Sequence, residues 1–534
     1  MSVQTSTEVK SLLRYCFLVR TLGFVLTVSL FLLPDHNADA FNPPQPIPQN
    51  RLDSLIREVL RGYRRWDSLY FSFIAQWNYL YEQSLAFFPL WPCLLGVISR
   101  IFHRFVFAIL QLDTVILLAG IILNLTFGLA ICVLLFRLGL VVLGSVKVSY
   151  FAAVLFCLNP ALVFFSSLYS ESVFLFFTLL GLLSYEQGRL FRASFFFALS
   201  VACRSNGLLN LGYIGYALIC SDACSKLIWN EHTILDTKRS FATLLKNTFR
   251  WWFLLAVTLL PYLCFVLISL LPLIVYQVYA YYLFCSDAFL PGNMDFLAIP
   301  RPPQSLVEFG RQAHLQFPRF IYSNYSLSVN QPPPSWCLSN LPFSYSHIQK
   351  SYWSVSLFGY YEFKQIPNFL LAFPVVLLSL ACAAAFYARA PKTYKTLGLT
   401  AETPRDRRLL PYVLHMLFLT VYGVTHINVQ VLTRIIFSSC PVIYWYCAYL
   451  LSNCSTWQFT VTTQLSDRKK RDVTTSGAGC ANNCVQTIRS DFYRLISIFN
   501  PAFGSNRKQK VLLLYFVSYA VMGTVLHSKF LPWT

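Results

Sequence analysis

Residues 112–136 read LDTVILLAGIILNLTFGLAICVLLF, an apolar run with one charged side chain, at Asp113. About 20 apolar residues make a helix long enough to cross the hydrocarbon core of a bilayer. Within lipid the backbone must satisfy its own hydrogen bonds, so only helices and closed barrels span it. Because this run lacks the alternation of barrel strands, it predicts a membrane-spanning helix.

Similar apolar runs recur along all 534 residues of the chain. They fall near 12–33, 86–103, 148–168, 171–187, 193–220, 251–285, 366–388, 410–426, 428–451 and 511–528. Since short or paired runs can be re-entrant, we expect about ten crossings. The fold class predicted is an all-α polytopic membrane protein, with residues 1–534 in a single multi-pass membrane domain.

The composition supports this fold class, because 56% of residues are hydrophobic and only 12% are charged. Soluble domains carry about 25% charged residues. The net charge of +20 would suggest nucleic acid in a soluble protein. Here the basic residues gather in short loops between apolar runs, which indicates membrane topology, and no nucleic-acid partner is expected.

Three loops are strongly basic, and the positive-inside rule places them in the cytosol. They are 222–250, 389–408 and 456–510, the last with its basic residues in 468–510. Two long loops then lie on the opposite side, 34–85 and 286–365. The second loop is rich in proline and aromatic residues, so we expect it to pack against the membrane face. The first apolar run could be a signal peptide, but we favour an uncleaved first span with a cytosolic N-terminus.

The first long loop carries the carboxylate of Asp67. Trp66, Tyr70, Phe73 and Trp77 recur at the spacing of one helical stripe, which predicts a helix lying in the membrane interface. Asp67 lies about 100° away from that stripe, at its wet edge. It is either a general base at the membrane surface or a first-turn acid stabilised by the helix dipole.

Three further charged residues are candidates for a site. Glu82 is the second carboxylate of the first loop, with a solvated loop residue as the alternative. Glu171 stands where two apolar runs meet, so it either begins a helix or belongs to a site. Arg204 interrupts the run 193–220 and must reach water, a carboxylate or a ligand phosphate. The alternative for Arg204 is a tight turn between two short helices on the cytosolic side.

Two later segments combine polar or aromatic groups. His426, Gln430 and Arg434 are spaced to share one helical face, where they could bind a phosphate at the non-cytosolic surface. Arg434 departs from the positive-inside expectation, which favours a functional role. The residues Tyr352 and Trp353 are either an aromatic belt at the start of a span or a surface that stacks on a sugar.

Several sequence blocks, taken in order, resemble one family. They include Arg65-Trp66-Asp67, Tyr79-Leu80-Tyr81-Glu82, Ala86-Phe87-Phe88-Pro89, Asn159-Pro160-Ala161, Tyr169-Ser170-Glu171-Ser172, Arg204-Ser205-Asn206-Gly207 and Val429-Gln430-Val431-Leu432-Thr433-Arg434. From about residue 60 to the end, this order resembles the PIG-V family, the GPI mannosyltransferase 2 enzymes. The basic loop 456–510 is the least similar part.

The resemblance implies a GT-C type glycosyltransferase in the endoplasmic reticulum membrane, with its active site in the lumen. Such enzymes take mannose from dolichyl phosphate mannose, and this family adds the second mannose of the GPI glycolipid through an α1,6 bond. The partners implied are the lipid-linked donor, the GPI acceptor, membrane lipid and a possible small membrane subunit. Alternatives are another dolichyl-phosphate-sugar-dependent GT-C enzyme, or a lipid transporter or scramblase. A transporter would show two matching halves, and none is found in the sequence.

The reaction that the resemblance implies requires a base for the acceptor and a cation for the leaving group. A β-linked donor and an α-linked product call for inversion, with one carboxylate base on the acceptor hydroxyl. The departing phosphate calls for a nearby cation. We predict Asp67 and Glu82 as the catalytic carboxylates, and a substrate-binding set of Arg65, Trp66, Glu171, Arg204, His426, Gln430 and Arg434. Arg434 is the first choice for the phosphate. Since no D-x-D pair is present, neither a metal nor a cofactor is expected.

Overall fold

The computed structural model describes residues 3–38, 40–221, 241–286, 301–319, 321, 332–401, 403–452 and 506–533. These residues form helices and no β-strand. Six helices within them are long and apolar enough to cross a membrane: α1 (Val3–Ser29), α5 (Leu112–Leu143), α11 (Phe241–Phe284), α15 (Ile366–Arg389), α17 (Pro404–Thr425) and α21 (Arg507–Ser528). The predicted all-α multi-span fold is confirmed.

A bent pair of helices accounts for one more crossing at most. α18 (Leu432–Ser439) and α19 (Pro441–Leu451) meet at an angle of 81° around Cys440, and Pro441 begins the second helix. If the pair is one span, the described residues hold seven crossings. The expected number of about ten crossings is therefore not confirmed.

Four shorter helices explain the difference: α6 (Val146–Cys157), α7 (Glu171–Glu186), α8 (Leu190–Cys203) and α9 (Leu211–Ile219). The apolar run 193–220 is broken between α8 and α9 by the 3-10 helix η5 (Ser205–Asn210). The run 148–168 is broken after α6, where Asn159 accepts a hydrogen bond from the backbone N–H of Ala161 at 2.7 Å. Hydropathy alone does not show such breaks, so one apolar run can correspond to two shorter helices.

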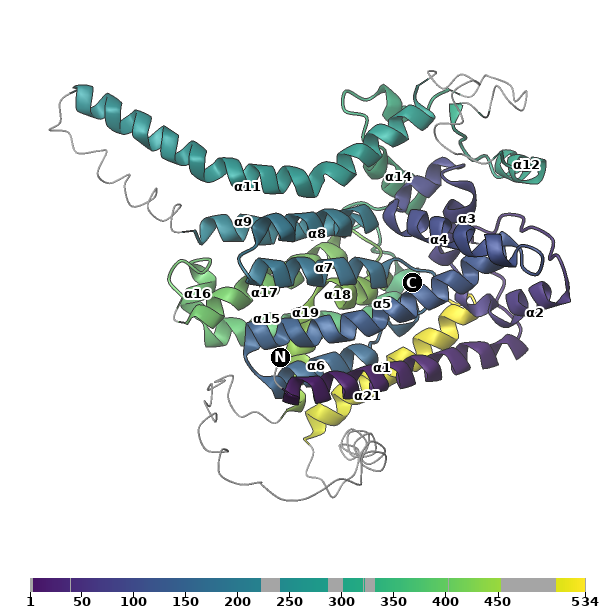
Figure 1. Cartoon of the computed structure of the whole chain (residues 1–534), viewed down its shortest axis with the longest axis horizontal. Coiled ribbons are helices and arrows are strands. Elements are labelled where there is room, and N and C mark those ends of the chain that lie inside the picture. The colour runs from purple at the N-terminus through teal and green to yellow at the C-terminus, as the bar shows by residue number, and fades with distance from the viewer. Residues whose placement is uncertain are drawn as a thin grey trace.

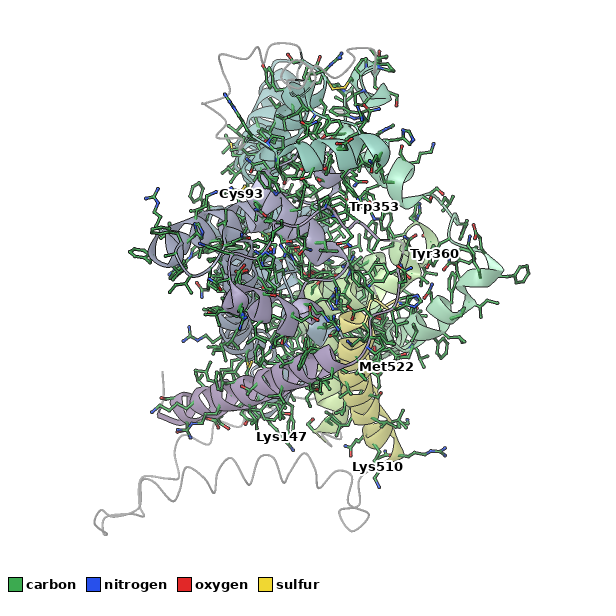
Figure 2. All side chains as sticks on the ribbon, turned by 90° about the vertical axis from the view of Figure 1, so that its right-hand side faces the viewer. Cys93, Lys147, Trp353, Tyr360, Lys510 and Met522 are labelled. Carbon is green, nitrogen blue, oxygen red and sulfur yellow. A yellow bond between two sulfur atoms is a disulfide. The ribbon has the colours of Figure 1, made fainter. Side chains whose placement is uncertain are left out.

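The two long loops gather at one end of the helices. In Figure 1, α2 (Arg51–Val59), α3 (Asp67–Trp77) and α14 (Ser344–Trp353) lie together at the right, while α16 (Pro391–Lys395) lies at the left. α16 belongs to the basic loop 389–408, so the basic loop and the two long loops occupy opposite ends. Figure 2 looks onto the end with the long loops, where Trp353 lies between Cys93 of α4 (Leu90–Val106) and Tyr360.

The helix that carries Asp67 is enclosed by protein. α3 packs against α4 and α5, and Phe73 is only 5% exposed. The rings of Tyr70 and Phe73 contact Phe41, with centroids 4.2 Å and 5.4 Å away. Other segments of the protein thus cover much of this aromatic stripe, and its position at the membrane interface stays a prediction.

The second long loop packs onto the first. Phe317 contacts Tyr81, with ring centroids 5.6 Å apart, and Trp336 is buried in the same apolar cluster. A disulfide joins Cys285, just after α11, to Cys337 in the loop. The described parts of this loop therefore cover the first loop, where we had expected contact with the membrane face. The scatter of cysteines in the sequence gave no sign of this bond.

Candidate active site

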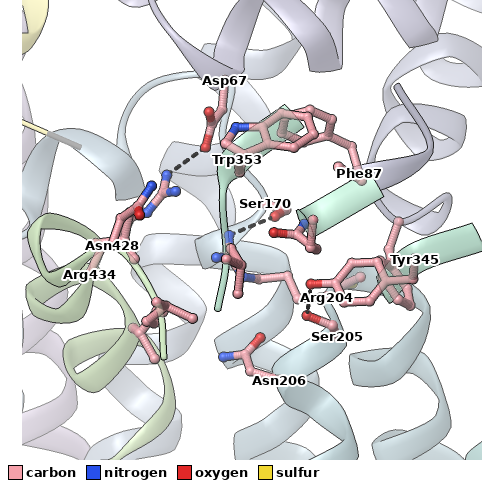
Figure 3. Close-up of a pocket in the computed structure, with 18 of the residues that line it drawn as sticks. Asp67, Phe87, Ser170, Arg204, Ser205, Asn206, Tyr345, Trp353, Asn428 and Arg434 are labelled. Atoms are coloured by element: carbon pink, nitrogen blue, oxygen red, sulfur yellow. Dashed lines mark hydrogen bonds and ion pairs between the residues drawn. The ribbon is translucent and has the colours of Figure 1, made fainter. Parts of the chain in front are cut away.

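A cavity of about 200 Å³ opens among α3, η5, α14 and α18 (Figure 3). Its polar lining comes from segments far apart in the sequence: Asp67, Ser170, Arg204, Ser205, Asn206, Tyr345, Gln349, Asn428 and Arg434. Three of the predicted site residues, Asp67, Arg204 and Arg434, line it together. Glu171 lies directly behind this wall, bonded to Arg204.

Asp67 reaches the cavity from the first turn of α3. The residue before it, Trp66, has φ = +52°, a conformation that is rare and strained for a bulky side chain. The backbone N–H of Asp67 donates to the hydroxyl oxygen of Tyr169 at 3.3 Å. Asp67 is therefore a first-turn acid that also faces a cavity, and its role as a general base stays a prediction.

Arg434 is the direct partner of Asp67. Its Nη1 lies 2.7 Å from Oδ2 of Asp67 and 3.8 Å from Oε1 of Glu171. The guanidinium also lies over the rings of Phe164 and Tyr169, at 5.4 Å and 5.5 Å from their centroids. The aromatic rings and the two carboxylates together hold the guanidinium of Arg434 in place next to Asp67.

A second ion pair lies next to the first. Nη1 of Arg204 donates to Oε1 of Glu171 at 2.6 Å and to the hydroxyl of Ser170 at 3.2 Å. The Glu171 side chain is fully buried at the start of α7, so a helix start and a site role coincide. Two acids and two guanidinium groups thus balance one another, as buried charges require.

The position of Arg204 depends on a close approach at Gly207. A Cβ atom at Gly207 would lie 2.7 Å from the backbone carbon of Ser200 and from the backbone nitrogen of Val201. Only glycine lets η5 fold back this tightly on α8. The tight turn that we weighed for Arg204 exists, and it lies at the same cavity as Asp67.

The opposite wall is built from aromatic rings and amides. Trp353, Phe87 and Tyr345 line it, and the hydroxyls of Tyr345 and Ser205 are 2.6 Å apart (Figure 3). Rings offer apolar faces and amides such as Asn206 offer donors and acceptors, a combination that suits a sugar. Of the two readings of Tyr352 and Trp353, the position of Trp353 favours the sugar-stacking surface.

Our site prediction omitted several of these lining residues. Ser170 and Asn206 stand inside blocks that carried the resemblance, next to Glu171 and Arg204. Tyr345 and Asn428 gave no signal, because single polar or aromatic residues in loops are common. Packing of the second loop is what brings Tyr345 to the cavity.

Glu82 lies outside the cavity and holds the second loop. Its Oε1 accepts from the indole N–H of Trp336 at 2.7 Å, and its Oε2 accepts from the hydroxyl of Tyr352 at 2.8 Å. It is 2% exposed, so it is not a solvated loop residue either. Burial and the Glu82 carboxylate raise the pKa of Tyr352, which keeps its hydroxyl a donor. We therefore correct its expected role from a catalytic carboxylate to a residue that positions α14.

Two other predicted residues of the first loop face away from the cavity. Arg65 pairs with Asp35, and its guanidinium lies over the ring of Phe530 at 4.5 Å. The ring of Trp66 contacts Phe530 as well, with centroids 5.6 Å apart. Neither residue lines the cavity of Asp67.

The expected helical face of His426, Gln430 and Arg434 is wrong. α17 ends at Thr425, the 3-10 helix η9 (Val429–Val431) intervenes, and only Arg434 lies in α18. His426 stacks on Tyr422, with centroids 4.7 Å apart, and Gln430 accepts from the hydroxyl of Tyr360 at 3.2 Å. The break in the helix turns these side chains away from Arg434.

Potential metal ligands in the described part of the chain gather at one place. The thiols of Cys16, Cys132 and Cys157 lie together, buried among α1, α5 and α6. None of them lines the cavity. Within the cavity wall, both carboxylates are already paired with guanidinium groups, which is a poor environment for a cation.

The chain is similar to known proteins over nearly its whole length. The family model described as Mannosyltransferase (PIG-V) matches residues 9–534. The GPI alpha-1,6-mannosyltransferase 2 of Cricetulus griseus is 33% identical over 540 residues, with 98% of each chain covered. The human protein of that name is 32% identical over 539 residues, again with 98% of each chain covered.

A solved structure that resembles the chain is the Archaeoglobus fulgidus oligosaccharyltransferase in its apo form. The TM-score is 0.40 and the sequence identity is 12%, over 97% of this chain and 56% of the other. The description of the fold given above rests on the helices of the protein itself.

Replacing Glu82 with glutamine tests its positioning role. The amide keeps the volume but loses one acceptor, and a buried hydrogen bond to a charged group contributes about 1.5–3 kcal/mol. We expect Glu82→Gln to lower the unfolding temperature in detergent, with activity reduced and its pH profile unchanged. The control Glu308→Gln changes an exposed acid paired only with Arg311, so the unfolding temperature should stay the same. Loss of activity at unchanged stability would instead make Glu82 a substrate contact.

Proposed function

The chain belongs to the PIG-V family of mannosyltransferases, as its motif order predicted, and on that premise we propose its reaction. It is a glycosyltransferase and a multi-pass membrane protein. We propose that it transfers mannose from dolichyl phosphate mannose to the one-mannose GPI precursor, through an α1,6 bond. The observation that supports this most is the carboxylate of Asp67, 2.7 Å from the guanidinium of Arg434, on the wall of a cavity suited to a sugar.

The proposed step is a single displacement with inversion. Asp67 takes the proton of the acceptor hydroxyl while that oxygen bonds to C1 of the donor mannose. The bond between C1 and the phosphate oxygen breaks, and its electron pair leaves with dolichyl phosphate. A base on one side and a leaving group on the other give inversion at C1.

Arg434 is placed to stabilise the negative charge that passes from Asp67 to the departing phosphate. Before the step one negative charge is on Asp67, and after it that charge is on the phosphate. As Asp67 becomes neutral, Arg434 is released to pair with the departing phosphate, so the total charge of the site does not change. A cation already held in place costs no reorganisation during the reaction. Arg204, held by Glu171, adds positive charge to the same wall.

Three features support a luminal site in the endoplasmic reticulum. The helix α16 of the basic loop 389–408 lies at the opposite end of the molecule from α3 and α14 (Figure 1), which contribute residues to the cavity. With a cytosolic N-terminus, the spans α1, α5 and α11 bring the loop after α11 to the luminal side, and α15 returns the chain to the basic loop. The disulfide between Cys285 and Cys337 suits an oxidising compartment.

We also propose that transfer needs no metal ion. The two guanidinium groups of the site already supply the positive charge that a divalent ion would bring to the phosphate. EDTA added to purified protein should leave the transfer rate unchanged, measured with labelled dolichyl phosphate mannose. A rate that falls with EDTA and returns with Mg²⁺ or Mn²⁺ would contradict this.

Asp67→Asn tests the base. Asparagine keeps the shape and the contact with Arg434 but cannot take the proton, and general base catalysis contributes about 10²- to 10⁴-fold. Conversion of the one-mannose precursor to a two-mannose product should fall by that factor when both proteins are assayed well below their unfolding temperatures. Full transfer by the asparagine variant would remove Asp67 from the mechanism.

Arg434→Gln tests the phosphate role. Loss of the guanidinium should raise the KM for dolichyl phosphate mannose more than the KM for the acceptor, and should also lower kcat. Arg434→Lys keeps a charge without the planar fork, so it should restore part of the rate. Equal effects on both substrates would count against a contact with the donor phosphate.

A further inference from the structure

A second cavity, of about 350 Å³, lies on the other side of the segment Arg65–Trp66. The mechanism above makes no use of it. Four arginines line it, Arg57, Arg61, Arg64 and Arg65, together with the acids Asp35 and Glu58. Such a concentration of guanidinium groups at the loop end of a membrane protein is typical of an anion site.

Two of the four arginines are neutralised by buried carboxylates that lie outside the cavity lining. Arg57 lies 3.1 Å from a carboxylate oxygen of Asp53 and 3.3 Å from one of Asp113. Arg64 makes two bonds to Asp113, one of them at 2.7 Å. Asp53 and Asp113 are buried and do not line the cavity. These pairs form the rigid back of the second cavity.

The remaining cations are not fully compensated. Arg61, Arg65 and Lys529 converge on the single carboxylate of Asp35, at 3.6 Å for Nε of Arg61 and 3.3 Å for Nζ of Lys529. Glu58 lies 2.7 Å from Nη1 of Arg61, but its side chain is 56% exposed and well screened by water. The three cations are compensated by only two acids, Asp35 and the solvent-screened Glu58. The group therefore carries an excess of positive charge.

The excess charge is open to a ligand. The side chains of Asp35 and Arg61 are 26% and 27% exposed, so solvent reaches both. Arg65 is held against the ring of Phe530, which leaves its position fixed when a ligand arrives. Nη2 of Arg61 donates to the backbone oxygens of Phe31 and Leu33 at 2.8 Å and 3.0 Å. A phosphate entering here would therefore compete with Glu58 and Asp35 for a guanidinium that is already positioned.

The second cavity is also close to the base. Arg65 and Asp67 are two residues apart, so their Cα atoms are at most about 7 Å from one another. The ring of Trp66, packed on Phe530, stands between them. One elongated substrate would therefore contact both places by passing the ring of Trp66, with a sugar hydroxyl at Asp67 and an anionic group at Arg65.

We propose that Arg61 and Arg65, on the wall of the second cavity, bind the phosphodiester of the acceptor lipid, with Lys529 adding positive charge through its contact with Asp35. This inference rests on the proposed function, in which the acceptor is a glycosylated phosphatidylinositol. Arg434 serves the donor phosphate, and the acceptor carries a second phosphate, between its inositol and its lipid. The second cavity matches that group in charge, so it selects acceptors that carry an anionic lipid anchor.

The test compares two synthetic acceptors with the same glycan. One joins the one-mannose glycan to its lipid by a phosphodiester and the other by an uncharged ether. The original protein should use the phosphodiester acceptor with the lower KM. Arg61→Gln should raise that KM on the order of tenfold, as loss of a hydrogen bond between charged groups predicts. The donor KM, kcat and the KM for the ether acceptor should stay unchanged.

Further variants separate binding from folding. Lys529→Gln should act like Arg61→Gln, and Arg61→Lys should restore most of the affinity. Asp35→Asn removes the acid that holds the three cations, so it should lower the KM for the phosphodiester acceptor, an effect that damage to the fold would not produce. Arg51→Gln changes an exposed arginine at the start of α2, the helix that precedes Arg61; it is the matched control and should change neither KM.

Each outcome bears on the proposal. Equal KM values for the two acceptors in the original protein, or equal losses for both in Arg61→Gln, would overturn it. Neutral nanodiscs with added phosphatidylserine test bulk anionic lipid. If phosphatidylserine changes the rate of the original protein but not of Arg61→Gln, and the acceptors do not differ, the cavity binds bulk lipid and the proposal is wrong. No transfer to either acceptor by the original protein would overturn the proposed function instead.

Discussion

The structure depends on the mutual neutralisation of four charges in an otherwise apolar protein: Asp67, Glu171, Arg204 and Arg434. A single charge inside a membrane protein costs at least about 2.5–3.5 kcal/mol, and removing one member of a buried pair costs about 3–5 kcal/mol. Here each acid lies within 4 Å of a guanidinium group. The arrangement is therefore stable without ligand, and it can pass one negative charge from Asp67 to a phosphate without a net change.

These charges are possible only because the helices are broken. α7 starts at Glu171, α8 ends just before Arg204, and α18 is separated from α17 by η9. Each break frees backbone groups that water or side chains must satisfy, and in membranes such breaks occur where they line a cavity. The short helices that reduced the number of crossings are thus the same elements that build the site.

The loop end of the molecule holds this site in place. Glu82 fixes Trp336 and Tyr352, and the disulfide at Cys337 ties the same loop to α11, so α14 presents Tyr345 and Trp353 to the cavity. Behind Trp66, a second set of cations converges on Asp35. Together they form one surface on which two anionic lipids could meet, with the aromatic wall of Trp66 and Phe530 between their phosphates.

The sequence by itself determined the all-helical membrane fold, the positions of the apolar runs, the family, and three of the side chains that line the cavity. These follow from local quantities, since the length of an apolar run, the order of motifs and an acid beside an aromatic stripe are all visible in the chain. Only the tertiary structure decided that Arg434 pairs with Asp67 across 367 residues, that His426 and Gln430 turn away, and that Glu82 positions a loop. Hydropathy does not reveal where a helix breaks, and a charged residue shows its partner only after the breaks and the packed loops have set its direction.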